Sequence, residues 1–162
     1  MKALIVYTSW LSSTRVVAKL LAAKLAQPDL LVRYAPAARI ALDDLADYDL
    51  LVLGADVRMS HANKRLRSLC TALPRHRLGR LEVALFGVRP AEWPPRHRHS
   101  ALGELQACLA DRGCELALPA PELELQPVKA LLPWVGLGKP ERAKVAEFAV
   151  DLWAASMPEP MI

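Results

Sequence analysis

Short apolar stretches rich in β-forming residues alternate along this chain with segments whose apolar residues recur at helical spacing. Residues 3–7 (ALIVY) form the first such stretch, and an unbroken apolar run is typical of a strand buried on both faces of a parallel sheet. From Thr14 to Leu25 the apolar residues follow a helical period, and Pro28 ends this segment. This alternation limits the possible folds more than any other feature of the sequence.

The same alternation continues to the end of the chain. Further strands are expected at residues 30–34, 50–53, 83–86 and 114–118. Helices are expected over about 61–73, from a cap at Ser100 to a stop at Gly113, and from Pro140 onward, with a short helix near Asp43. Gly54 is expected to close the third strand, while Pro119 and Pro121 interrupt the fifth.

Five consecutive βα units predict an α/β protein, a three-layer doubly wound fold around a five-stranded parallel sheet. No internal repeat or domain linker is visible, so residues 1–162 are expected to form a single domain. In such sheets ligands bind beyond the carboxyl ends of the strands, where the strand order reverses. The loops after the strands are therefore the segments in which to look for a site.

Composition indicates the cellular compartment and the charge of suitable partners, but it identifies no particular partner. The chain is 53% apolar, and 21 Lys and Arg stand against 17 Asp and Glu, a mildly basic balance that suits anionic partners. We expect no nucleic-acid partner. Three cysteines without metal-ligand spacing predict no metal site and favour a reducing compartment, the cytoplasm. No stretch approaches the ~20 apolar residues that a membrane helix needs.

Residues 7–14, YTSWLSST, join the first strand to the first helix and are rich in hydroxyls. A helix start offers unpaired backbone N–H groups and a positive dipole end, and hydroxyls add donors around a bound phosphate. The loop has neither GxGxxG nor GxxxxGK[ST], so it is neither a dinucleotide fingerprint nor a Walker A loop. The alternative is that Ser12 or Ser13 simply caps the helix.

Two motifs carry a resemblance to a known family. Thr8, Ser9, Ser12 and Thr14 occupy the places of the phosphate-binding loop of flavodoxins, with Ser12 where those proteins have glycine. Residues 53–61, LGADVRMSH, resemble the G-A-S-I-R-Y-G-H segment of menaquinone-dependent protoporphyrinogen dehydrogenases, which are flavodoxin-fold FMN enzymes of haem biosynthesis. The resemblance implies a flavodoxin-like sheet in the order 2-1-3-4-5 and FMN as the cofactor.

The resemblance also implies a set of cofactor-binding positions. These are Thr8, Ser9, Trp10, Ser12, Ser13, Thr14, Ala55, Asp56, Val57, Arg58, Met59, Ser60 and Trp93. Trp10 and Trp93 would supply planar walls for the isoalloxazine, with Met59 as a substitute for an aromatic wall. The alternative for both tryptophans is that they cover a sheet edge.

Residues with a catalytic or docking role follow from the same resemblance. His61 would lie near the flavin or the substrate and move a proton during substrate oxidation, although a capping or solvated histidine is the alternative. Arg58 would face an anionic substrate group, or else form a surface ion pair. The basic residues 94–99 and the apolar residues 130–135 could contact a porphyrinogen, a quinone or an anionic membrane, or else be a solvated loop and a segment packed on the sheet.

Two functions from different classes are consistent with these features. The first is an FMN-dependent oxidoreductase of the protoporphyrinogen-dehydrogenase type, which passes electrons from a reduced tetrapyrrole or similar substrate to a quinone, in the cytoplasm or peripherally on the inner face of the plasma membrane. The second is a flavodoxin-fold protein that has lost FMN and serves as a binding module. Ser12 and Ser60 at family glycines and the Pro119–Pro121 loop favour the second.

Overall fold

A computed structural model describes residues 1–8, 13–56, 64–73, 80–90, 101–125 and 137–156. Its elements in chain order are β1 Lys2–Tyr7, α1 Ser13–Leu25, β2 Leu31–Pro36, the 3₁₀ helices η1 Ala37–Arg39 and η2 Asp43–Asp47, β3 Leu50–Asp56, α2 Lys64–Ala72, β4 Glu82–Pro90, α3 Ala101–Asp111, β5 Glu122–Leu125 and α5 Lys139–Ser156. The strands and helices thus alternate as predicted, and η2 confirms the short helix near Asp43.

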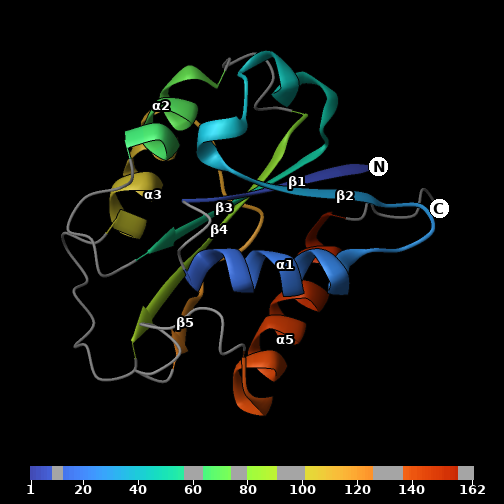
Figure 1. Cartoon of the computed structure of the whole chain (residues 1–162). Coiled ribbons are helices and arrows are strands. Elements are labelled where there is room, and N and C mark those ends of the chain that lie inside the picture. Colours follow the sequence, from blue (N-terminus) through green and yellow to red (C-terminus); the bar gives the residue numbers. More distant parts are fainter. Residues whose placement is uncertain (9–12, 57–63, 74–79, 91–100, 126–136, 157–162) are drawn as a thin grey trace.

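The five strands form one parallel sheet in the order β2-β1-β3-β4-β5 (Figure 1). The chain passes from β1 to β2 on one side and then returns to place β3 on the other side of β1, so the winding direction reverses between β1 and β3. This confirms the predicted doubly wound α/β fold. It also puts the crevice expected for a ligand at the carboxyl ends of β1 and β3.

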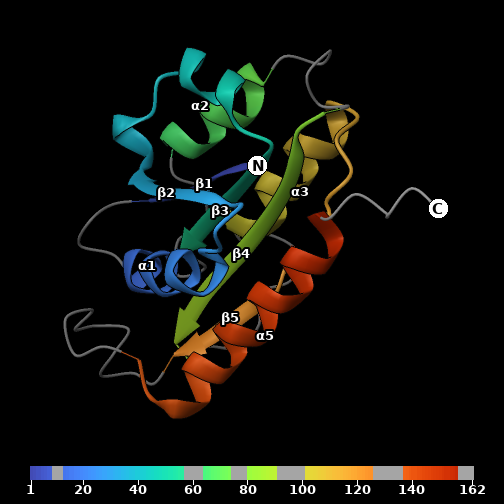
Figure 2. The same ribbon diagram turned by 90° about the vertical axis from the view of Figure 1, so that its right-hand side faces the viewer.

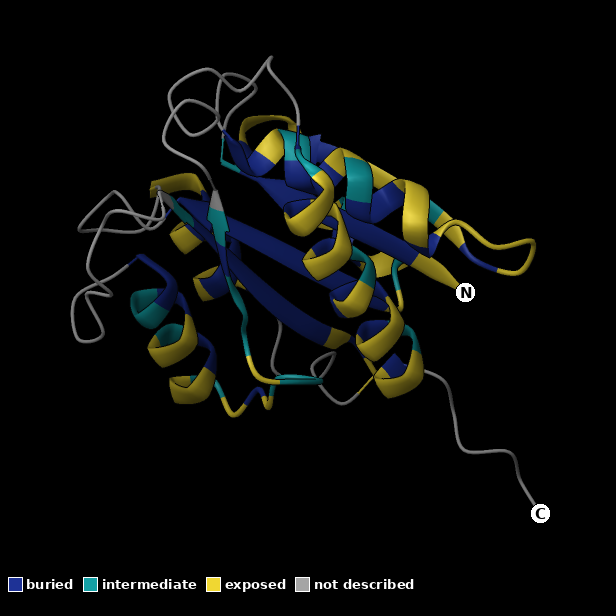
Figure 3. Ribbon diagram, turned by 90° about the horizontal axis from the view of Figure 1, so that it is seen from below, coloured by how far each residue is buried: buried dark blue, intermediate teal, exposed yellow. Residues whose placement is uncertain are grey.

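Two helical layers cover the two faces of the sheet (Figure 2). On one face α1 packs beside α5, and on the other α2 packs beside α3. Because side chains alternate along each strand, every central strand contributes to both layers. Figure 3 shows the buried sheet between helices whose outer sides are exposed. Residues of the first core include Ile5, Val52, Phe86 and Phe148, and those of the second include Leu4, Leu53, Leu85 and Leu105.

Gly54 lies inside β3, so the prediction that it closes the strand is wrong. The strand continues to Asp56, and Gly54 is paired in register with Phe86 of β4. A Cβ atom at position 54 would lie 2.3 Å from Cζ of Phe86. The glycine is therefore required because the phenyl ring of the neighbouring strand occupies its side-chain space, and not because the chain turns there.

The fifth strand is also displaced from its predicted position. Residues 114–118 make only an isolated bridge between Leu116 and Val83, and β5 proper follows the two prolines. The Gly87 N–H donates to the Pro121 carbonyl at 2.9 Å. Proline lacks an N–H but keeps its carbonyl, so pairing with β4 resumes at Pro121.

Two helix ends behave as their sequences indicate. Gly113, the second residue after the end of α3, has a φ of +75°, which confirms it as the stop residue. At the start of α5, a carboxylate oxygen of Glu141 accepts a hydrogen bond from the Gly138 N–H, half of a capping box. Within the described residues, no helix combines the length and apolar character needed to cross a bilayer.

Candidate cofactor site

Two threonine hydroxyls meet at the carboxyl end of β1. Thr8 follows the last residue of β1, and Thr14 is the second residue of α1. Their Oγ1 atoms lie 3.0 Å apart, a hydrogen-bond distance. Thr14 is fully buried and Ser13 is 2% exposed. The structure therefore brings together three of the hydroxyl residues that the sequence proposed as a phosphate site.

The start of α1 is electrostatically suited to an anion. Its first turn holds no acidic residue, so the positive end of the helix dipole is not neutralised from within the helix. Ser13 and Thr14 are the first two residues of α1, where a helix leaves backbone N–H groups without a partner inside the helix. These residues fit the phosphate group of FMN in charge and in hydrogen-bonding character.

Ala55 and Asp56 end β3 beside this helix start. Val6 of β1 is paired in register with Leu53 of β3, so the ends of the two strands are adjacent. Ala55 is 1% exposed and Asp56 is 6% exposed. Because Val52 packs in the core beneath α1 and α5, strand alternation directs Asp56 to the same face. A buried carboxylate thus lies at the carboxyl end of β3, where a ligand is expected.

An ion-pair cluster that the sequence analysis missed joins β4 to β5. Arg89 Nε donates to Glu122 Oε2 at 3.0 Å, and Arg89 Nη2 donates to Glu124 Oε1. The Arg89 side chain is only 11% exposed. The signal in the sequence is the alternation of Glu122 and Glu124 with leucines after Pro121, which is typical of a strand. The prediction of strand five at residues 114–118 hides this signal.

The other predicted positions lie outside the described residues. They are Ser9, Trp10, Ser12, Val57, Arg58, Met59, Ser60, His61 and Trp93, together with residues 94–99 and 130–135. Their assignments stay predictions. Of the proposed cofactor-binding set, the structure places Thr8, Ser13, Thr14, Ala55 and Asp56 at the carboxyl ends of β1 and β3 and at the start of α1.

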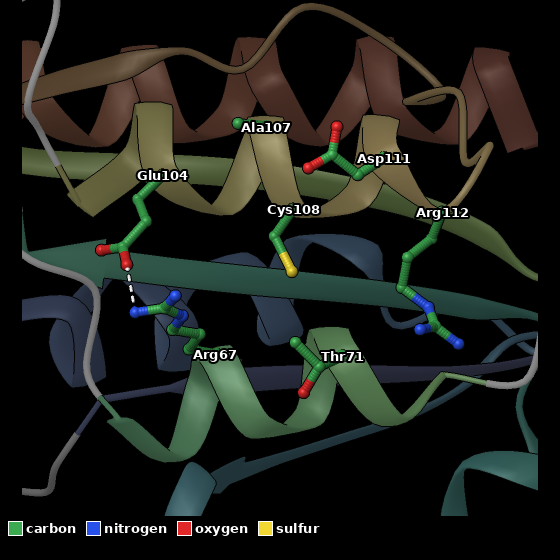
Figure 4. A pocket seen from close by; sticks show the side chains of 7 residues that line it. All are labelled: Arg67, Thr71, Glu104, Ala107, Cys108, Asp111 and Arg112. Atoms are coloured by element: carbon green, nitrogen blue, oxygen red, sulfur yellow. Dashed lines mark ion pairs between the residues drawn. The ribbon is translucent and has the colours of Figure 1, made fainter.

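A cavity of about 440 Å³ lies away from this crevice, between α2 and α3 (Figure 4). Arg67 Nη1 pairs with Glu104 Oε1 at 2.9 Å across it. Arg112 lies at the other end, where its Nη2 donates to the Leu73 carbonyl. Two arginines, Glu104 and Asp111 line the cavity, so its charges cancel and no ligand class is indicated.

The described cysteines are free thiols without a catalytic setting. Cys70 is fully buried, and burial raises the pKa of its thiol to about 12. Burial also raises the pKa of the Cys114 thiol. Among the described residues, no cluster of His, Cys, Asp or Glu could hold a metal ion. These thiols behave as small apolar residues of the core.

Comparisons with known proteins agree with the geometry. Residues 4–111 match the family model described as a flavodoxin domain. Flavodoxin 1 from Bacillus cereus superposes with a TM-score of 0.68 at 16% identity, over 95% of this chain and 98% of that chain. Flavodoxin 2 from the same organism superposes with a TM-score of 0.68 at 21% identity, over 95% of this chain and 99% of that chain. A short-chain flavodoxin associated with a bacterial microcompartment gives 0.72 at 13% identity, over 97% and 99%. No curated protein sequence matches the chain.

Proposed function

The chain belongs to the flavodoxin domain family, whose members are FMN-binding flavoproteins that transfer electrons, and from this premise we propose that it is an FMN-dependent oxidoreductase of the protoporphyrinogen-dehydrogenase type. It would pass electrons from a reduced tetrapyrrole or similar substrate to a quinone. The observation that carries the FMN part is the pair of hydroxyls, Thr8 and Thr14, at the carboxyl end of β1.

We assign each described site residue a role in binding the cofactor. Thr8, Ser13 and Thr14 would hold the phosphate through hydroxyls and the N–H groups at the start of α1. Bound FMN would supply the redox chemistry, while the protein fixes its position and surroundings. Asp56 and Ala55 would border the cofactor from the end of β3. A carboxylate there would orient polar hydrogen-bond donors of the cofactor rather than its phosphate, because two anions side by side repel.

The choice of substrate rests on residues 53–61. Their likeness to the protoporphyrinogen dehydrogenase segment supports a tetrapyrrole substrate, with His61 proposed to move a proton. Arg58 is proposed to face an anionic group of that substrate. The structure supports this only to the extent that β3 extends to Asp56, so the following residues start at the carboxyl edge of the sheet.

The competing proposal is a flavodoxin fold that has lost FMN. Ser12 and Ser60 stand where the family has glycines, and the two prolines before β5 depart from the family pattern. A side chain at a glycine position that a ligand approaches closely narrows the space for that ligand. In that case the protein would act as a binding module on the same scaffold.

Reaction of the FMN-loaded protein with candidate substrates tests the proposal. Under anaerobic conditions, protoporphyrinogen should bleach the flavin absorbance, and menaquinone should then restore it. His61→Ala should slow the bleaching while FMN stays bound. If the protein retains FMN but protoporphyrinogen does not reduce it, the dehydrogenase assignment is overturned. Electron transfer by a flavodoxin would then remain as the function. Failure to retain FMN at saturating concentration would favour the binding module.

A further inference from the structure

Helix α5 carries apolar side chains on its outer face as well as on its inner face. Phe148 and Leu152 are buried in the core, whereas Val150 is 67% exposed. Trp153 is only half-buried and Ala154 is exposed. These three residues share one face of the helix, because they are spaced three and four positions apart. Single exposed apolar residues are common, but a contiguous set is typical of a contact surface, and we call Val150, Trp153 and Ala154 the α5 patch.

A hollow of about 310 Å³ lies beside the α5 patch, between α5 and the end of α1. Val150 and Trp153 line it from α5, and Lys24 and Gln27 line it from the end of α1 and the residues that follow. The C-terminal ends of the two helices thus lie together (Figure 1). One surface therefore holds a protruding valine and, next to it, a space that an apolar side chain could fill.

A second hollow, of about 580 Å³, lies on the other flank of α5, between this helix and β5 (Figure 2). Lys144, Glu147 and Asp151 line it from α5. Glu122 lines it from β5, but this carboxylate is already paired with Arg89. Within the described part of the chain, the three residues of α5 form no salt bridge. One lysine and two carboxylates make this flank acidic.

The flank on the side of α1 is basic. Lys24 is the one charged residue among the described residues that line its hollow, and it forms no salt bridge with any of them. A lysine in the last turn of a helix is favoured by the helix dipole, so Lys24 by itself does not indicate a partner. Its importance is that the two flanks of the α5 patch carry opposite charge.

A second copy of the chain matches this surface in shape and in charge. Rotation by 180° about an axis that runs along α5 exchanges the two flanks, so Lys24 of each copy faces Glu147 and Asp151 of the other. The two Val150 side chains then meet at the axis, each beside the hollow of the other copy. Because the protrusion, the hollow and both charged flanks belong to the same surface, the contact closes at two copies.

We propose that the α5 patch and its two flanks form the interface of a two-fold symmetric dimer of this chain. Burial of Val150 and Trp153 supplies the affinity, and the charged flanks fix the orientation of the two copies. The proposal does not depend on FMN. The helices run from the carboxyl end of the parallel sheet to its amino end, so the last turns of α5 lie away from the carboxyl ends of β1 and β3. Both proposed cofactor sites stay open in the dimer.

Sedimentation equilibrium of the full chain tests the proposal. The unchanged protein should dimerise with a dissociation constant of roughly 1–100 µM, as expected for a contact made largely by one helix. Val150→Lys should raise this constant roughly tenfold or more, because it puts a charge into the apolar centre of the contact. The matched control is Leu31→Lys on β2, which adds the same charge at a residue that is also 67% exposed and should have no effect. Equal weakening by the two variants, or a monomer at concentrations up to about 1 mM, would overturn the proposal.

Charge reversal tests the two-fold arrangement. Lys24→Glu and Asp151→Lys should each raise the dissociation constant roughly threefold to tenfold, because each change places like charges opposite one another across the axis. The double variant should dimerise nearly as well as the unchanged protein, since the two charges have only exchanged places. A double variant that dimerises no better than the single variants, or single variants without effect, would overturn the arrangement. Circular dichroism of the diluted variants checks that each is folded. FMN content is read separately from flavin absorbance, so loss of FMN alone would contradict only the proposed function.

Discussion

The two neighbours of β4 are held to it in different ways. β3 pairs with β4 from Leu50↔Glu82 to Asp56↔Val88, and the ring of Phe86 fills the space that Gly54 leaves. β5 pairs with β4 only from Gly87↔Glu122 to Pro90↔Leu125, and Arg89 bridges to its two glutamates. Shape complementarity therefore fixes the centre of the sheet, whereas charge contributes to fixing the edge strand β5. The stability contributed by the edge should therefore depend on salt, and the edge should open locally more often. The stability contributed by the centre should not depend on salt.

The largest expected effect is at the centre of the sheet. Gly54→Ala places a methyl group inside van der Waals contact with the Phe86 ring, so the strands must move apart or the ring must rotate. We expect the free energy of unfolding to fall by about 3 kcal/mol, as for an overpacked core. Urea denaturation followed by circular dichroism measures it.

A double-mutant cycle isolates the cause of this loss. Phe86→Leu removes the ring atoms closest to position 54, so Gly54→Ala should cost under about 1 kcal/mol in that background. An unchanged cost would mean that backbone effects, and not the ring, require the glycine.

The next largest effect is at the edge of the sheet. Arg89→Met leaves the two carboxylates of β5 without their partner, and we expect a loss of about 2 kcal/mol, because both glutamates keep some contact with water. Salt should shrink this loss, since it screens the wild-type ion pairs, while the loss from Gly54→Ala should not change. Denaturant titrations at low and high salt provide the measurement.

Arg67→Met is the matched control for the edge prediction. Arg67 also pairs with a glutamate, but its side chain is 60% exposed. Its replacement should change stability by less than about 0.5 kcal/mol. Equal losses for the two variants would contradict the view that the partly buried cluster holds the edge.

A smaller effect is expected at the turn that leads into strand five. Gly113 has a positive φ, and a Cβ there would meet no atom within 4 Å. Gly113→Ala should therefore cost only the backbone strain, about 1 kcal/mol. Gly113→Asn should cost less, because asparagine adopts this conformation more readily. If alanine and asparagine destabilise equally in thermal unfolding, strain at this residue is not the cause.

The smallest expected effect is a difference in the rate at which two buried thiols react. It is measured on the unchanged protein, so no change of stability is involved. Both thiols belong to the same core cluster, but Cys114 lies outside the helices and strands, before the isolated bridge at Leu116, whereas Cys70 lies in α2. Cys70 is fully buried, and burial raises the pKa of its thiol to about 12, so labelling needs an opening of the structure. Mass spectrometry after timed treatment with a thiol reagent should show that Cys114 is modified roughly tenfold faster than Cys70. Faster labelling of Cys70 would place the weaker region at the centre.

The sequence predicted the elements whose signal is local. The apolar run at residues 3–7 and the period from Thr14 to Leu25 correspond to β1 and α1. Gly54 and strand five were misplaced, because each depends on a partner in β4: the Phe86 ring in one case and the Gly87 N–H in the other. A single sequence cannot show which residue of a neighbouring strand lies opposite. For the same reason the hydroxyls of the site were found, but the Arg89 cluster was not.

The most direct test of the account is the affinity for FMN, measured by quenching of flavin fluorescence. The unchanged protein should bind one FMN per chain, and Thr14→Val, which removes a buried hydroxyl at the start of α1, should weaken binding roughly tenfold or more. Thr71→Val, which removes an exposed threonine hydroxyl on α2, should leave the affinity unchanged. Equal affinities of the two variants, or no binding of FMN at all, would contradict the proposal that this helix start holds the cofactor phosphate.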